Sequence, residues 1–370
     1  MTGETLITAA SLQDIARGAA VLGSGGGGDP YIGRLLAERA LAAYGNVRLV
    51  SLDDVPDSAT IVPLAMMGAP TVVIEKPPAQ GQFVTALRCM EASLGRAATH
   101  LVCLEAGGLN SLIPVVAAAE AGLPLVDADG MGRAFPELQM VLPGLNGIPA
   151  APVAMADDIG DTVTIRAADN TKAERLARAV TIEMGCRAAI ALYAMTGSQA
   201  RVSLINGSLR LAERIGAVIR SSRLAHGDTA GAVAAAAHGQ VLFAGKVVDV
   251  HQRTEGGFAR GEADLAGLGI YEGTVARIRF QNEYLLILQG TEMLACVPDI
   301  ICLLDKESGE PITTESLRYG LRVVVVALPC HERWRTDEGL ALVGPGYFGY
   351  EFVYSPIDST VVRTRRANHS

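Results

Sequence analysis

Short apolar segments alternate with helix-like segments in the first third of the chain, and this alternation constrains the fold more than any other feature. Helical spacing of apolar residues covers residues 82–95 and 111–122. The strand-like apolar segments on either side cover residues 46–52, 60–68, 100–108 and 124–130. Strands separated by crossover helices pair in parallel and are covered on both faces. The pattern therefore predicts an α/β N-terminal domain with a mainly parallel sheet.

The pattern changes near residue 240, where strand-like runs such as "GKVVDVHQRT", "GTVARIRFQN" and "RVVVVALP" follow one another with turns between them. Few helical windows interrupt these runs, so they predict a second, β-rich domain. We therefore expect an α/β catalytic domain at residues 1–240, with a candidate sub-boundary near residue 170. The β-rich domain takes residues 241–356 and a polar tail takes residues 357–370.

Composition restricts the class of protein. Of the 370 residues, 49% are hydrophobic and 19% charged, which suits a large core, and the net charge of −8 argues against nucleic acid or an anionic membrane as a main partner. No run of 18 uncharged apolar residues occurs, and the start "MTGETLITAA" lacks the features of a signal peptide. The six cysteines are scattered without a Cys-x-x-Cys pair, so we expect reduced thiols in a cytoplasmic protein.

The segment "LGSGGGGDP" places five glycines in the six positions from Gly23 to Gly28. It matches the dinucleotide-binding pattern Gly-x-Gly-x-x-Gly, and Asp53 lies at the sequence distance expected of the acid that binds the ribose. However, a dinucleotide fingerprint follows a buried strand, whereas a helical segment precedes this loop. We favour a cradle of backbone N–H groups for an anion or a carbonyl, since glycine allows close approach, over a simple turn. The predicted substrate-binding residues here are Gly25, Gly26, Gly27, Gly28 and Asp29.

Polar residues also gather at the ends of two predicted strands. "LEAGGLN" supplies Glu105 and Asn110 as substrate-binding residues, and "VDADGMGRAFPELQM" supplies the remaining candidates. Because the carboxyl ends of parallel strands meet at one edge of a sheet, ligands usually bind there. The predicted catalytic residues are Asp127, Asp129 and Glu137, with Arg133 as a substrate-binding residue.

Three carboxylates and a guanidinium suit either of two tasks, general acid–base catalysis or binding of a hard divalent cation. Asp127 and Asp129 share a face, since strand side chains alternate. A capped helix with an Asp–Arg pair is the structural alternative. The sequence contains no histidine-rich zinc motif, so it does not indicate whether a metal binds or which one.

The junction segment "GKVVDVHQRTEGGFARG" reads as a hairpin with a glycine turn. Lys246 and Arg253 lie on it, and such side chains can close over an anionic ligand held by the other domain. We predict both as substrate-binding residues.

These stretches, together with "MMGAPTVVIEK", "RFQNEYL", "VPDIICLLD" and "GPGYFGYEF", occur in an order that resembles the DUF917 family, named after S-methyl thiohydantoin desulfurase. The resemblance covers about residues 10–355. It implies an α/β N-terminal domain, a β-rich domain of the swivelling type, and a hydrolase whose substrate is a five-membered cyclic amide such as a hydantoin or thiohydantoin. It also implies partners of the hydantoinase or oxoprolinase type.

The resulting hypothesis is an enzyme that removes sulfur or methanethiol from ring C2 by activated water. The carboxylates serve as base and acid, the glycine loop and Asn110 donate hydrogen bonds, and Arg133, Lys246 or Arg253 engages an anionic tail. The alternative is a non-catalytic subunit of a hydantoinase-type complex, and a homo-oligomer is the base-rate expectation. The hypothesis requires the glycine loop and the Asp127–Asp129 pair to face one cleft.

Overall fold

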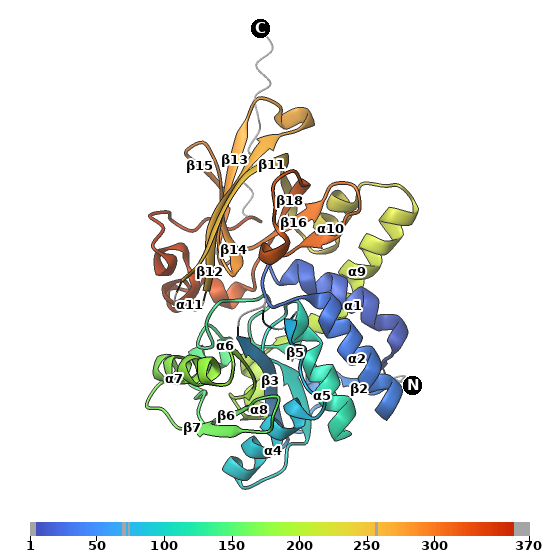
Figure 1. The fold of residues 1–370 in the computed structure, drawn as a ribbon, viewed down its shortest axis with the longest axis vertical. Coiled ribbons are helices and arrows are strands. Elements are labelled where there is room, and N and C mark those ends of the chain that lie inside the picture. The colour runs from blue at the N-terminus through green and yellow to red at the C-terminus, as the bar shows by residue number, and fades with distance from the viewer. Residues whose placement is uncertain (1–4, 69–71, 73–74, 256–257, 359–370) are drawn as a thin grey trace.

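The computed structural model describes residues 5–68, 72, 75–255 and 258–358, and it contains two β-sheets, one in each half of the molecule (Figure 1). Strands β1 to β10 form the first sheet, and strands β11 to β18 form the second. The division between the sheets falls at Gln240, where β11 begins. Within the described ranges, no helix is long and apolar enough to cross a membrane.

The N-terminal sheet has a parallel core, as predicted, extended by antiparallel strands. Its strand order is β1-β2-β5-β4-β3-β8-β6-β7, with β9 on β3 and β10 on β5. Strands β2, β5, β4 and β3 pair in parallel, and the other pairs are antiparallel. The strands are β1 (Thr5–Ile7), β2 (Val47–Val50), β3 (Thr60–Gly68), β4 (His100–Cys103), β5 (Leu125–Asp129), β6 (Val153–Ala156), β7 (Thr162–Ile165), β8 (Arg187–Ala191), β9 (Met195–Thr196) and β10 (Ile205–Asn206).

Helices cover both faces of this sheet, which explains why its central strands β3, β4 and β5 are almost entirely buried. Helices α1, α2, α4 and α5 pack on one face, while α7, α8 and residues 131–150 pack on the other. The α-helices are α1 (Ala9–Leu22), α2 (Pro30–Tyr44), α4 (Gln82–Leu94), α5 (Ile113–Ala121), α6 (Leu142–Leu145), α7 (Asn170–Glu183), α8 (Gly197–Ser203), α9 (Ser208–Leu224), α10 (Thr229–Ala236) and α11 (Asp337–Val343).

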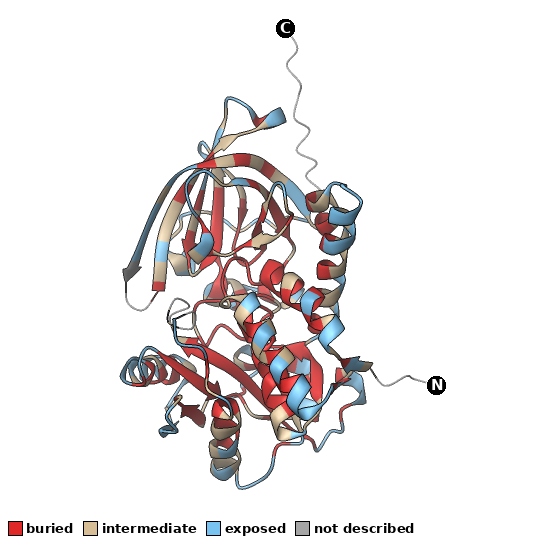
Figure 2. Ribbon diagram, turned by 45° about the vertical axis from the view of Figure 1, so that its right-hand side comes forward, coloured by how far each residue is buried: buried red, intermediate tan, exposed pale blue. Residues whose placement is uncertain are grey.

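The C-terminal sheet is antiparallel throughout, which confirms the predicted β-rich domain. Its strand order is β15-β14-β13-β12-β11-β18-β16-β17. Buried residues are concentrated in the strands of both sheets (Figure 2). The strands are β11 (Gln240–Glu255), β12 (Phe258–Gly267), β13 (Val275–Gln281), β14 (Glu283–Gln289), β15 (Glu292–Cys296), β16 (Ile300–Asp305), β17 (Pro311–Ile312) and β18 (Arg322–Leu328).

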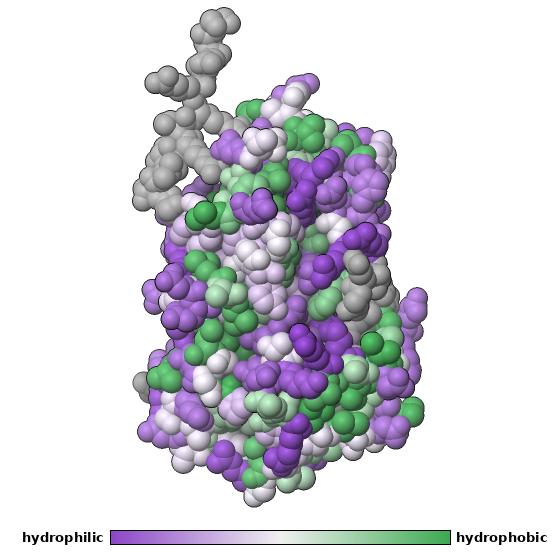
Figure 3. All heavy atoms as spheres, turned by 90° about the vertical axis from the view of Figure 1, so that its left-hand side faces the viewer, coloured by the Kyte–Doolittle hydropathy of each residue, from purple (hydrophilic) through white to green (hydrophobic). Residues whose placement is uncertain are grey.

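Three helices join the two sheets through a shared apolar core. Side chains of α1, α9 and α10 pack together with side chains of β16 and β18. Helices α1 and α9 cross closely, since a Cβ at Gly18 would lie 1.8 Å from the Ala212 carbonyl oxygen. On the face that carries α7, α11 and the β11–β12 hairpin, hydrophilic and hydrophobic residues are interspersed (Figure 3).

The glycine loop between α1 and α2 binds directly to the C-terminal sheet. The Ser24 carbonyl accepts a hydrogen bond from the Tyr284 amide at 2.6 Å, and the Gly25 carbonyl accepts one from Thr314 at 3.0 Å. The Ser24 hydroxyl accepts from the Ile301 amide at 3.2 Å and lies 2.8 Å from the Ile301 carbonyl oxygen. Ser24 is completely buried. The loop therefore fixes the C-terminal sheet onto the N-terminal domain.

We expect Ser24→Ala to lower the free energy of unfolding by about 1–3 kcal/mol, because it leaves buried backbone groups of β16 without a partner. Urea denaturation measures this loss. Ser221→Ala, which removes an exposed hydroxyl bonded within α9, is the matched control and should change the value by less than about 0.5 kcal/mol. Equal stability of the two variants would contradict the interpretation.

Candidate active site between the two domains

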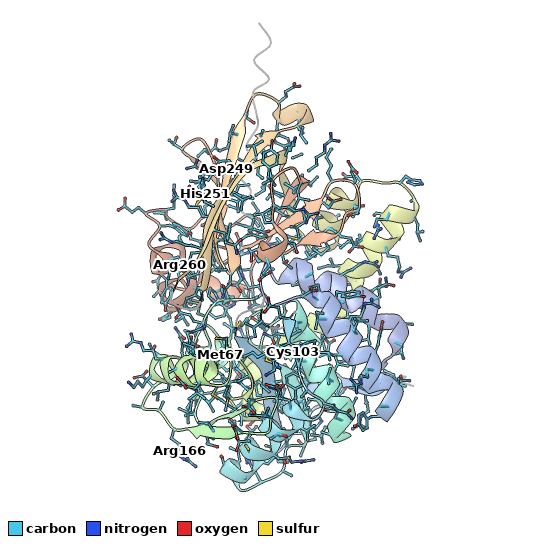
Figure 4. All side chains as sticks on the ribbon, in the orientation of Figure 1. Met67, Cys103, Arg166, Asp249, His251 and Arg260 are labelled. Atoms are coloured by element: carbon cyan, nitrogen blue, oxygen red, sulfur yellow. The ribbon has the colours of Figure 1, made fainter. Side chains whose placement is uncertain are left out.

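A small pocket lies where the glycine loop, the N-terminal sheet and the C-terminal sheet meet. The loop contributes Gly26–Gly28, and the ends of β3 and β4 contribute Met67, Glu105 and Asn110. Residues 135–138 and Arg178 form another wall, and the β13–β14 turn contributes Asn282 and Glu283. Met67 lies in the N-terminal sheet below the domain boundary (Figure 4). The pocket is therefore at the carboxyl edge of the parallel core, where ligands of such sheets usually bind.

Glu105 is the first of two buried carboxyl groups in this pocket. Asn110 donates a hydrogen bond from Nδ2 to Glu105 Oε1 at 2.7 Å. The Asn110 amide is itself held by the Met66 backbone, accepting from N–H at 2.8 Å and donating to the carbonyl at 3.1 Å. Burial raises the pKa of Glu105 to about 7. This carboxyl group is thus oriented firmly and exchanges its proton near neutral pH.

Glu283 is the second buried carboxyl group, and it comes from the other domain. It follows Asn282, whose φ of 59° forms the tight turn between β13 and β14. A Cβ on Gly26 would lie 2.1 Å from Glu283 Oε1, so a side chain at this position would displace the Glu283 carboxyl group. Burial, reinforced by the charge of Glu105, raises the pKa of Glu283 well above its usual range, although Arg133 opposes the shift. Within the described chain, Oε2 has no hydrogen-bond partner.

Glu137 and Arg178 occupy the outer part of the same pocket. The Tyr347 hydroxyl donates a hydrogen bond to Glu137 Oε2 at 2.8 Å. Arg178 binds Glu174 at 2.5 Å and lies over the ring of Phe258, 4.3 Å from its centroid. Since Phe258 begins β12, the end of the β11–β12 hairpin reaches the pocket wall formed by α7.

Asp127 and Asp129 share a face of β5, as predicted, but neither lines this pocket. Asp127 Oδ1 caps α9 by accepting from the amides of Leu209 and Arg210, at 2.9 and 3.2 Å. Asp129 accepts from Met131 at 2.8 Å and Gly132 at 2.6 Å through Oδ2, and from the Ser208 hydroxyl through Oδ1. Burial raises the pKa of Asp129 to about 6. The glycine loop thus shares its cleft with the residues after Asp129, not with the two aspartates.

The predicted cationic residues also lie outside the pocket. Arg133 is buried and donates to the carbonyl groups of Pro298 and Asp299, at 3.1 and 2.6 Å. Lys246 lies 5.6 Å from the ring centre of Tyr319. Arg253 lies opposite Arg260 on the β11–β12 hairpin, and Figure 4 shows Arg260 close to the domain boundary.

Two predicted residues of the glycine loop have structural contacts. Asp29 caps α2, because its Oδ1 accepts from the Tyr31 amide at 2.7 Å. Gly25 packs against Tyr284 and does not line the pocket. The predicted residues that the pocket does bring together are Gly26, Gly27, Gly28, Glu105, Asn110 and Glu137.

Sequence reasoning missed Asn282, Glu283 and Arg178. An available signal was the acid in "FQNEYLLIL", because a glutamate at the start of a fully apolar strand must be buried or must bind something. Arg178 gives no such signal, since it lies on an ordinary amphipathic helix.

The surroundings of the glycine loop differ from those of a dinucleotide fingerprint. The loop follows helix α1, with Gly23 as the C-cap, and α2 begins at Pro30. A fingerprint loop leaves a buried strand. Among the described residues, no group of three or more histidine, cysteine, aspartate or glutamate side chains is arranged to hold a metal ion.

The raised pKa of Glu105 predicts a pH-dependent stability. Because the folded pKa of about 7 exceeds the usual 4.5, the folded state holds this proton more tightly than the unfolded chain. The contribution to stability is complete below pH 4.5 and is lost as the pH rises to about 7, by roughly 3 kcal/mol at most.

The Glu105→Gln side chain is uncharged at every pH, so it does not lose stability as wild type does between pH 4.5 and pH 7. The unfolding free energy of the variant should therefore rise relative to that of wild type as the pH increases through this range. Urea denaturation at several pH values measures the difference. The exposed Glu272→Gln is the control and should give a curve parallel to wild type. A parallel curve for Glu105→Gln would show that Glu105 titrates normally.

Comparison with known proteins assigns the chain to a family. Residues 10–167 match the family model described as S-Me-THD-like, N-terminal domain, and residues 168–357 match S-Me-THD-like, C-terminal domain. The two models divide the chain before α7, whereas the two sheets separate at β11. No curated protein matches the chain.

A crystal structure of a protein from Chromobacterium violaceum is similar over 96% of this chain and 100% of its own, with 25% identity and a TM-score of 0.77. Its similarity supports the arrangement of a mixed α/β domain and an antiparallel β domain. Because the two family models together cover nearly the whole chain, the protein belongs to the S-Me-THD-like (S-methyl thiohydantoin desulfurase-like, DUF917) family.

Proposed function

We propose that the pocket between the domains hydrolyses a five-membered cyclic amide of the S-methyl thiohydantoin class and releases methanethiol from ring C2. The observation that carries this proposal is the pair of buried carboxyl groups, one from each domain, beside the glycine loop. Family membership supports the substrate class. Two carboxyl groups with raised pKa values can hold and transfer protons at neutral pH.

In the first step, ionised Glu105 takes a proton from water as the water oxygen forms a bond to C2. Glu283, which burial keeps protonated, donates its proton to the adjacent ring nitrogen. In the second step the C2–S bond breaks, Glu105 returns its proton to the sulfur, and Glu283 regains a proton from the C2 hydroxyl. The products are methanethiol and a ring with a C2 carbonyl, and both carboxyl groups end as they began.

The glycine loop supplies hydrogen-bond donors for this reaction. Within the described part of the chain, no hydrogen bond engages the amides of Gly27 and Gly28, and both residues line the pocket. Free backbone amides at this position suit a ring carbonyl that gains negative charge in the transition state. Glu137, held by Tyr347, lies at the outer wall and contacts the ring substituent.

Asp127 and Asp129 are the alternative pair of catalytic carboxylates. We assign the proton transfers to Glu105 and Glu283 because the backbone of α9, the backbone of residues 131–132 and the Ser208 hydroxyl already engage the two aspartates. The two assignments predict different effects of substitution.

Glu105→Gln and Glu283→Gln should each lower kcat by about 100-fold or more on an S-methyl thiohydantoin, because each loses one proton transfer. Release of methanethiol, measured with a thiol reagent, gives the rate. Both variants replace a buried acid by its neutral isostere, so they should fold. Glu272→Gln is the control and should keep wild-type activity.

Asp129→Asn is the decisive comparison. If folded Asp129→Asn is inactive while Glu105→Gln and Glu283→Gln retain full rates, the assignment to the two glutamates is wrong, and the aspartates carry out the proton transfers. Wild-type protein that turns over no hydantoin or thiohydantoin would overturn the proposed function and favour a non-catalytic subunit.

A further inference from the structure

A second cavity lies between the two domains, on the other side of the segment that carries Glu105. Its volume is about 290 Å³, compared with about 90 Å³ for the first pocket. Glu105 lines the first pocket and its neighbour Ala106 lines the second. In the same way Met131 faces the first pocket and Gly132 faces the second. The two cavities therefore have no lining residue in common.

The walls of the second cavity are largely apolar and come from both domains. Leu22 of α1 and Leu211 of α9 contribute from the N-terminal domain, while Ile300 of β16 and Leu328 of β18 contribute from the C-terminal sheet. An engineered apolar cavity of about 150 Å³ holds benzene, so this cavity has room for a phenyl ring with a short chain.

The polar groups of this cavity differ in charge from those of the first pocket. Arg214, His238 and His331 line it, and its lining includes no aspartate or glutamate. The first pocket, by comparison, has three glutamates. In a chain with a net charge of −8, a cavity whose lining includes an arginine and no acid suits a negatively charged ligand.

Two of these groups are free to donate hydrogen bonds. Within the described chain, the exposed Arg214 has no hydrogen bond or ion pair, and Asp127, whose charge interacts with it, is paired with Arg210. His331 accepts the Arg333 amide at Nδ1, 3.3 Å away, so the neutral ring carries its proton on Nε2. Burial lowers the pKa of His331, which favours that neutral form.

We infer that this second cavity binds a small amphipathic carboxylate. The carboxylate lies against Arg214 and His331, and the hydrocarbon part lies against the apolar walls. Guanidinium groups bind carboxylates with strong, charge-assisted hydrogen bonds. This inference does not depend on the reaction proposed for the first pocket.

Isothermal titration calorimetry of the full chain tests this site with 3-phenylpropanoate and its neutral analogue, 3-phenylpropanamide. The acid should bind at least about tenfold more tightly than the amide, because only the acid pairs with Arg214. Arg214→Gln should remove that difference. Arg322→Gln, which changes an exposed arginine of the C-terminal sheet, is the matched control and should leave it intact.

Two further variants locate the bound acid. Ala237→Leu narrows the second cavity and should abolish binding of both compounds, whereas Glu105→Gln should leave binding unchanged. The inference is overturned if wild type binds neither compound, if acid and amide bind equally, or if Arg214→Gln keeps the preference. It is also overturned if Ala237→Leu binds normally or if Glu105→Gln loses the acid, since the acid then lies elsewhere.

Discussion

The contact between the glycine loop and the C-terminal sheet determines the rest of this structure. Ser24 and Gly25 bind the backbones of β14, β16 and residue 314, so the loop is hydrogen-bonded directly to the second domain. Gly26 then lies against Glu283, where a side chain would displace the carboxyl group. Because one loop makes both contacts, the arrangement of the domains and the shape of the pocket depend on the same residues.

This arrangement explains how two acids from different domains are brought into one buried pocket. Burying two carboxyl groups costs free energy when they ionise, and the protein avoids that cost by raising both pKa values. The charge of Arg133 partly opposes both pKa shifts, while its guanidinium group donates to the carbonyl groups of residues 298 and 299. The site therefore combines structural and chemical demands, and under the proposed function these two acids contribute proton transfer at a cost to stability.

Much of the fold could be predicted from periodicity. The alternation of apolar strands and helices predicts the parallel core, and the change of pattern near residue 240 predicts the antiparallel domain. The antiparallel pairing of β6, β7 and β8 does not follow from that pattern, because a short apolar run does not indicate the direction of the strand beside it. In the site, strand ends that meet at one edge bring Glu105 and Asn110 together. The sequence indicates that Glu283 is buried or binds something, but it does not indicate which residues Glu283 meets, because those lie far away in the chain.

The sequence by itself determined the two sheet types, the glycine loop and the shared face of Asp127 and Asp129, since these follow from local spacing and backbone sterics. Only the tertiary structure decided which acids meet. The side chains of Asp127 and Asp129 turn to the first turn of α9 and to the backbone of residues 131–132, because buried carboxylates take the nearest donors. Glu283 enters the pocket because a loop without side chains leaves room for it. Such choices depend on packing between distant segments, which local sequence patterns do not encode.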